Sequence, residues 1–216
     1  MEAVILAAGK GTRMHSQLPK VLHTIGNKPM LAHVIDSAES AGARKIHIIV
    51  GNDGEQVKDQ ILNFAPQIEV SWVLQKEQLG TAHAVLQAVP YFETKAQGDH
   101  ILVLYGDVPL IKPDTLRQLL ASTRAGAIGI LTLITKNNKG LGRILRDEAG
   151  EIIGIVEEKD ASDAQKEIQE VNSGIMALPV GQLKSWLNRI ERNNQQSEYY
   201  LTAVSYTHLT LPTSDL

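Results

Sequence analysis

The chain has 216 residues, of which 43% are hydrophobic and 21% charged, with a formal net charge of −3. It contains no cysteine, which excludes disulfides and thiolate metal sites. The near-neutral charge gives no electrostatic footprint for general nucleic-acid binding, so we expect small-molecule partners and no nucleic acid. No apolar run reaches the roughly 18 residues that span a bilayer, and Glu2 stands where a signal peptide would carry positive charge. We therefore expect a cytoplasmic protein with no membrane span.

Short β-branched or aliphatic runs alternate with helical patterns as far as Gly126. Strands are expected at 4–7, 46–50, 70–74, 101–105, 128–134, 152–156 and 171–178. Helices are expected at 31–38, 56–63, 81–89, from 113 onward, at 161–168 and at 182–192. This alternation predicts an α/β fold, a Rossmann-like, doubly wound, mostly parallel mixed sheet.

Beyond Gly126 the order of elements changes. A Gly-rich turn at 139–142 and an apparent hairpin from Arg143 to Val156 predict a smaller, sugar-side β lobe. From Val204 onward the chain has no helical period and is rich in β-branched and hydroxyl residues. We therefore expect a domain at 1–203 that is truncated at its C-terminal end, followed by an atypical tail at 204–216 that is non-native or disordered.

The first chemical motif is the Gly-rich segment 6–14, which follows the first strand directly. Its spacing fits neither a P-loop nor a dinucleotide fingerprint, because Val4 and Met14 stand where those motifs need glycine or another small residue. Lys10, Arg13 and Lys20 place three cations near this loop, a density that suits a polyphosphate. A solvated turn whose glycines serve only the backbone is the alternative.

Two further motifs follow predicted strands. Asp107, in Tyr105-Gly106-Asp107, stands at the carboxyl end of 101–105, where a hard oxygen ligand suits Mg²⁺ held between protein and phosphate. Gln75 can present a donor and an acceptor to a base edge, and Gly80 before Thr81 would permit close approach. The alternatives are an Asp that merely starts a turn and a Thr81 that merely caps a helix.

Three later residues are candidates for binding sugar hydroxyls. Gly142 lies in the Gly-rich turn, Glu157 follows a predicted strand, and Asn172 lies within Glu-Val-Asn-Ser-Gly. Each could instead be ordinary surface or turn chemistry. The seven histidines show no zinc spacing and no Gly-x-Ser-x-Gly nucleophile elbow occurs, so zinc catalysis and covalent hydrolysis are unsupported.

Taken together, these motifs resemble the sugar-1-phosphate nucleotidyltransferases. Within that superfamily they are most similar to the uridyltransferase domain of the bifunctional GlmU family. The likeness covers residues 2 to about 202. It rests on the segments 6–14, 18–22, 78–84, 104–110, 142–144, 155–160, 170–175 and 198–202.

The resemblance implies that UTP and N-acetylglucosamine 1-phosphate give UDP-N-acetylglucosamine and pyrophosphate, with Mg²⁺, in the synthesis of cell-wall and lipopolysaccharide precursors. Position by position, it implies three groups of residues. The catalytic group is Arg13, Lys20 and Asp107, with Asp107 as the Mg²⁺ ligand. The nucleotide group is Leu6, Ala7, Ala8, Gly9, Lys20, Gln75, Gly80 and Thr81. The sugar group is Tyr105, Gly106, Asp107, Gly142, Glu157 and Asn172.

The resemblance ends near residue 202. The family continues with an Asp, where this chain has Ala203, and later supplies an Asn as second Mg²⁺ ligand, for which no counterpart occurs here. The acetyltransferase domain through which full-length members trimerise is also absent from the 216 residues. We therefore expect weakened Mg²⁺ binding. Two alternatives stay open: another sugar-1-phosphate nucleotidyltransferase, such as a thymidylyl- or guanylyltransferase, and an inactive sugar-nucleotide-binding module.

Overall fold

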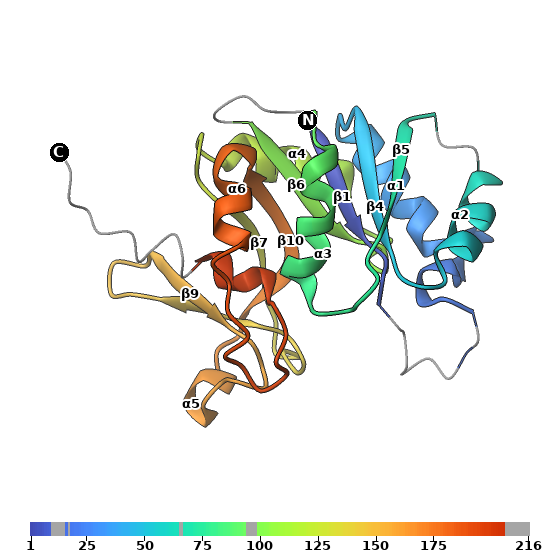
Figure 1. Cartoon of the computed structure of the whole chain (residues 1–216). Helices are drawn as coiled ribbons and strands as arrows, with labels where there is room; N and C mark the ends of the chain where they lie inside the picture. The colour runs from blue at the N-terminus through green and yellow to red at the C-terminus, as the bar shows by residue number, and fades with distance from the viewer. Residues whose placement is uncertain (10–15, 17, 65–66, 94–98, 206–216) are drawn as a thin grey trace.

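A computed structural model describes residues 1–9, 16, 18–64, 67–93 and 99–205. These residues build an eight-stranded mixed sheet in the order β5-β4-β1-β6-β10-β8-β9, with β7 paired to β10, and a small two-stranded sheet of β2 and β3 (Figure 1). The strands are β1 Glu2–Leu6, β2 Thr24–Ile25, β3 Lys28–Pro29, β4 Lys45–Val50, β5 Glu69–Leu74, β6 His100–Tyr105, β7 Gly129–Ile134, β8 Arg143–Arg146, β9 Ile152–Val156 and β10 Glu170–Pro179. The helices are α1 Met30–Ser40, α2 Gly54–Leu62, α3 Thr81–Ala88, α4 Pro113–Ser122, α5 Asp163–Lys166 and α6 Val180–Leu187, with short 3-10 turns at Lys20–Leu22, Val89–Tyr91 and Leu201–Ala203.

Four strands form the parallel half of the sheet. β1 pairs in parallel with β4 on one side and with β6 on the other, and β5 pairs in parallel with the far edge of β4. Strand order thus runs outward from β1 to β5 and then returns to the other side of β1, which is the order of a doubly wound sheet. The predicted fold class is confirmed.

Helices cover both faces of this sheet, because its strands are apolar on both sides. Along β1, Ala3 and Ile5 pack in the core that includes α1, α2 and α4, whereas Val4 packs in the core that includes α3 and α6. In Figure 1, α3 and α6 lie in front of the sheet. None of the helices in the described ranges is long and apolar enough to cross a membrane.

The predicted sugar-side lobe continues the same sheet. β10 pairs antiparallel with β6 through Met176–Pro179 and with β8 through Val171, and β8 and β9 form the predicted hairpin. Two helices are shorter than predicted. α5 covers only Asp163–Lys166 of the expected 161–168. α6 ends at Leu187, and Ile190 is buried from the loop beyond it.

Several features differ from the sequence reading in detail. The helical spacing in α4 predicts that Leu116, Leu119 and Leu120 are buried, but Leu120 is only partly buried. Val204 and Ser205 pack with the domain, Val204 being fully buried. The remainder of the predicted tail, 206–216, lies outside the described residues.

A matched pair of isoleucines tests the sheet. Ile48 of β4 is fully buried, whereas Ile134 at the end of β7 is 81% exposed. We expect Ile48→Ala to lower the free energy of unfolding by about 2–5 kcal/mol and Ile134→Ala to change it by about 0.5 kcal/mol or less. Urea denaturation measures both; equal effects would contradict the described packing of β4.

Candidate functional site

The candidate residues gather where β1 and β6 end side by side. Leu6 is the last residue of β1 and Tyr105 the last of β6, and they pair in the parallel register. The Gly106 N–H extends that ladder by donating to the Leu6 carbonyl at 3.0 Å. Because the strand order reverses between β1 and β6, this is the crevice in which open α/β sheets bind ligands.

The first segment of the Gly-rich loop leaves this crevice from β1. Ala7 N–H donates to the Ile49 carbonyl at 2.8 Å, which keeps Ala7 in line with β4. Gly9 is exposed, and a Cβ at this position would meet no atom of the described residues within 4 Å. Lys10 and Arg13, two of the three predicted phosphate-binding cations, lie outside the described residues.

The third cation, Lys20, forms an ion pair with Asp107. Lys20 Nζ lies 2.5 Å from Asp107 Oδ2, and both side chains are partly exposed. The pairing depends on Gly106, since a Cβ there would meet Val21 Cγ1 at 3.1 Å and Leu31 Cδ1 at 3.3 Å. Without a side chain, Gly106 lets the Asp107 turn pack on the buried Val21 beside Lys20. Residues 87 positions apart are thus brought together.

Asp107 fits the way proteins hold Mg²⁺ next to phosphates. Mg²⁺ is usually bound by one or two carboxylates together with substrate phosphates and water. Oδ2 pairs with Lys20, whereas Oδ1 accepts no hydrogen bond from the residues that the structure describes. The described ranges contain no cluster of three His, Asp or Glu side chains that could hold a metal. A metal here would therefore need oxygen ligands from the nucleotide.

The predicted base-reading residues follow β5, which is separated from β1 by β4 in the sheet. Gln75 is buried, and its backbone N–H donates to the Val50 carbonyl at 2.8 Å. Gly80 has φ 115° and begins α3; a Cβ there would lie 2.5 Å from the Tyr199 carbonyl oxygen. Glycine is therefore required at position 80 by the approach of the Tyr199 backbone. Thr81 does not cap α3 with its side chain, since its Oγ1 accepts from Leu201 N–H at 2.8 Å.

Tyr105 connects the parts of the site. Its ring packs against Gly174, where a Cβ would lie 2.5 Å from Cε2. Burial strongly raises the pKa of the Tyr105 phenol, the carboxylates of Glu157 and Asp107 raise it further, and a hydrogen bond with Thr81 opposes them. Tyr105 is therefore a neutral phenol that packs against Gly174, hydrogen-bonds Thr81 and lies within the electrostatic influence of Glu157 and Asp107.

The predicted sugar residues converge on the other side of Tyr105. The Asn172 N–H donates to the Gly142 carbonyl at 2.8 Å, and the Asn172 Oδ1 accepts from Gly174 N–H at 2.9 Å. Gly142 faces Glu157, because a Cβ there would lie 3.4 Å from both carboxylate oxygens. The bulge in β10 between Asn172 and Met176 contains Gly174, the residue that packs against the Tyr105 ring.

A segment late in the chain completes the site. Thr202 Oγ1 donates to Glu157 Oε1 at 2.9 Å, and a cavity of about 480 Å³ lies against these two residues and Tyr200. The sequence offers Thr202 only as the last residue of the 198–202 motif, so its role as partner of Glu157 could not be derived from spacing. Contacts thus link Gln75, Gly80, Thr81, Tyr105, Gly142, Glu157 and Asn172, whereas Gly9 is exposed and Arg13 lies outside the described residues.

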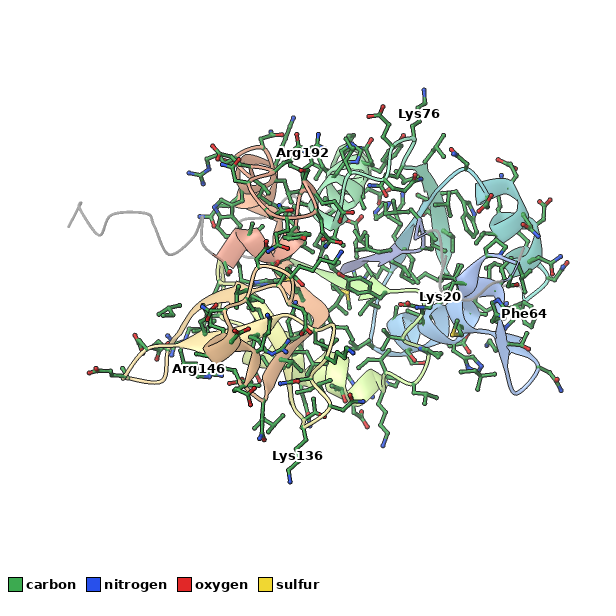
Figure 2. All side chains as sticks on the ribbon, turned by 90° about the horizontal axis from the view of Figure 1, so that it is seen from below. Lys20, Phe64, Lys76, Lys136, Arg146 and Arg192 are labelled. Atoms are coloured by element: carbon green, nitrogen blue, oxygen red, sulfur yellow. The ribbon has the colours of Figure 1, made fainter. Side chains whose placement is uncertain are left out.

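Three of the basic side chains labelled in Figure 2 differ in position. Lys76 and Lys136 point outward from the edge of the molecule, whereas Lys20 lies toward its middle. This contrast makes Lys136, which is exposed, a suitable control for Lys20.

Glu157 gives the site a pH dependence. Burial raises its pKa above the ordinary 4.5, and the hydrogen bond from Thr202 opposes the rise. The folded state therefore binds the proton more tightly than the unfolded chain, so the resulting stabilisation is present below pH 4.5 and is lost as pH rises through the folded pKa.

Glu157→Gln removes this titration and keeps an acceptor for Thr202. We expect the free energy of unfolding of the wild type, relative to Glu157→Gln, to fall as pH rises from about 4 to about 7. Denaturation at several pH values measures the difference. Parallel curves for the two proteins would contradict the burial of this carboxylate.

Two comparisons with known proteins agree with this geometry. The family model of MobA-like NTP transferase domains matches residues 3–174. A solved structure described as UDP-glucose pyrophosphorylase complexed with UDP-glucose superimposes with a TM-score of 0.78 at 18% sequence identity, covering 96% of this chain and 86% of that one. The chain therefore belongs to the family of MobA-like NTP transferase domains and has the fold of the sugar-1-phosphate nucleotidyltransferases.

Proposed function

We propose that this chain transfers the uridylyl group of UTP to N-acetylglucosamine 1-phosphate, giving UDP-N-acetylglucosamine and pyrophosphate. The observation that carries the proposal is the Lys20–Asp107 ion pair just after β6, whose last residue, Tyr105, hydrogen-bonds Thr81 and is affected by the charge of Glu157. One crevice thus offers groups suited to a base, to phosphates and to a sugar. The fold and family support a nucleotidyltransferase.

The proposed reaction needs little covalent chemistry from the protein. A phosphate oxygen of the sugar phosphate attacks the α-phosphorus of UTP, a new P–O bond forms, and the bond to the β-phosphate breaks to release pyrophosphate. The attacking oxygen is already ionised at neutral pH, so no general base is needed. The protein has to align two anions and stabilise the charge that develops between them.

Lys20 is the described cation for this task. Its partial exposure leaves the ammonium accessible from the crevice, and Arg13 is the predicted second cation. Asp107 would hold Mg²⁺ through its carboxylate. When bound, Mg²⁺ would neutralise charge on the phosphate oxygens and on the leaving pyrophosphate.

The predicted sugar-binding residues are compatible with an acetylated amino sugar and also with other sugars. Glu157 and Asn172 offer an acceptor and an amide to hydroxyl and acetamido groups. Glucose 1-phosphate is the second candidate, because the superimposed pyrophosphorylase was solved with UDP-glucose. The cytoplasmic location and the trimerisation of full-length relatives stay predictions.

Release of pyrophosphate tests the proposal. The full chain is incubated with Mg²⁺, one of UTP, TTP, CTP or GTP, and one of N-acetylglucosamine 1-phosphate or glucose 1-phosphate. We expect the fastest Mg²⁺-dependent release from UTP with N-acetylglucosamine 1-phosphate. Faster release from another pair would establish a different nucleotidyltransferase. Binding of UDP-N-acetylglucosamine with no release from any pair would establish an inactive binding module.

Removal of either member of the charge pair tests the phosphate clamp. We expect Lys20→Ala and Asp107→Ala each to lower kcat by about 10²–10³-fold while the thermal transition is retained, because both side chains are partly exposed. Lys136→Ala and Asp59→Ala alter exposed side chains of the same types and serve as controls. Near-normal turnover in Lys20→Ala or Asp107→Ala would remove that residue from the mechanism.

A further inference from the structure

The side-chain amide of Gln75 is held in one orientation by two acceptors. Gln75 is 3% exposed, and its Nε2 donates to the Gly80 carbonyl at 3.2 Å and lies 3.0 Å from His83 Nδ1. A carbonyl oxygen can only accept, so the group that faces Gly80 is the NH₂. Its second hydrogen is directed to His83 Nδ1, which must therefore accept.

His83 is itself fixed by its neighbours. Gln87 Nε2 donates to the His83 carbonyl at 3.2 Å. It also lies 3.2 Å from His83 Nε2, but this contact is not a hydrogen bond, because an imidazole whose Nδ1 accepts carries its proton on Nε2. The Tyr199 ring stacks near the imidazole, with centroids 6.4 Å apart, and the Arg192 guanidinium lies 5.5 Å from the Tyr199 centroid. The imidazole thus has little freedom to turn away from Gln75.

The amide oxygen of Gln75, Oε1, is therefore left to act as a hydrogen-bond acceptor. Both hydrogens of Gln75 Nε2 are used within the protein, whereas Oε1 accepts no hydrogen bond from the described residues. A ligand at Gln75 therefore meets an acceptor. Uracil offers a ring N–H, as does thymine, but cytosine has an unprotonated ring nitrogen at the same position and would place a lone pair against Oε1.

We propose that His83 is a positioning residue that sets the hydrogen-bonding polarity of the base site. By accepting from Gln75, it keeps Oε1 available for the ring N–H of a uracil-type base and disfavours cytosine. The inference rests on the proposed function, because it takes Gln75 to face the base of the nucleotide. It adds a residue and a direction of selectivity that the resemblance does not supply.

The test compares His83→Asn with His83→Leu. The two side chains have nearly the same shape, but only Asn can place an oxygen acceptor near the position of Nδ1. His83→Ala is a third variant, and Gln87→Ala is the control, because Gln87 contacts only the far edge of the imidazole. Isothermal titration of the full chain with UDP and with CDP measures the ratio of the two dissociation constants, and thermal melting checks that each variant is folded.

We expect the wild type to prefer UDP over CDP by roughly 100-fold or more, since the site pairs with a ring N–H that CDP lacks. His83→Leu and His83→Ala should lower this ratio by about 10-fold, because the Gly80 carbonyl alone then holds the amide of Gln75. His83→Asn and Gln87→Ala should keep it within about threefold.

Three outcomes would overturn the inference. One is a UDP-to-CDP ratio that is unchanged in His83→Leu and His83→Ala, including the case in which both nucleotides weaken equally, as a purely structural role would require. The second is an Asn variant that behaves like the Leu variant. The third is a wild type that binds CDP as well as UDP. A wild type that binds neither UDP nor CDP would overturn the proposed function together with the inference. The first two outcomes would overturn the role of His83 alone.

Discussion

The candidate site depends on one constraint, the parallel pairing of β1 with β4 and β6 at once. β1 lies between β4 and β6, and all three strands run in the same direction. The loop that follows β1 and the loop that follows β6 therefore begin side by side. The Gly106 N–H bonded to the Leu6 carbonyl marks this junction. Gly106 leaves room for Val21 beside it, and Lys20 and Asp107 form their ion pair at this point.

A second constraint is the way a late segment closes over the start of α3. Tyr199 accepts from Ala82 N–H at 2.9 Å and donates its own N–H to the Leu79 carbonyl at 2.7 Å. Two residues further on, Leu201 N–H donates to Thr81 Oγ1. The segment continues to Thr202, which bonds Glu157. One stretch of chain therefore braces both the base side and the sugar side of Tyr105, so that the positions of the two sides are linked.

Much of the fold could be predicted from the sequence, because buried parallel strands leave a plain signal. The aliphatic runs that become β1, β4 and β6 are apolar on both faces, and helical patterns separate them. The strand-end motifs were also accessible, since Asp107 and Gln75 follow such runs directly. These predictions use only neighbouring residues, which is the range over which periodicity and turn chemistry act.

The contacts that the sequence could not supply join residues far apart in the chain. The sequence predicts that Gly80 lets a ligand approach closely, whereas in the structure its missing side chain makes room for the Tyr199 backbone. The link from Thr202 to Glu157 spans 45 positions. His83 reads as one helical residue of a motif, and only the fold shows that it accepts from Gln75. No local pattern encodes such pairings, because they follow from how the sheet is wound.

The central claim is that one crevice at the ends of β1 and β6 binds the whole sugar nucleotide. The most direct test is a crystal structure of the chain with UDP-N-acetylglucosamine. We predict the diphosphate within hydrogen-bond reach of Lys20, the uracil at Gln75 and the sugar against Glu157 and Asn172. A nucleotide bound elsewhere, for instance at the opposite, amino ends of the strands where His47 of β4 pairs with Glu2 of β1, would contradict the account.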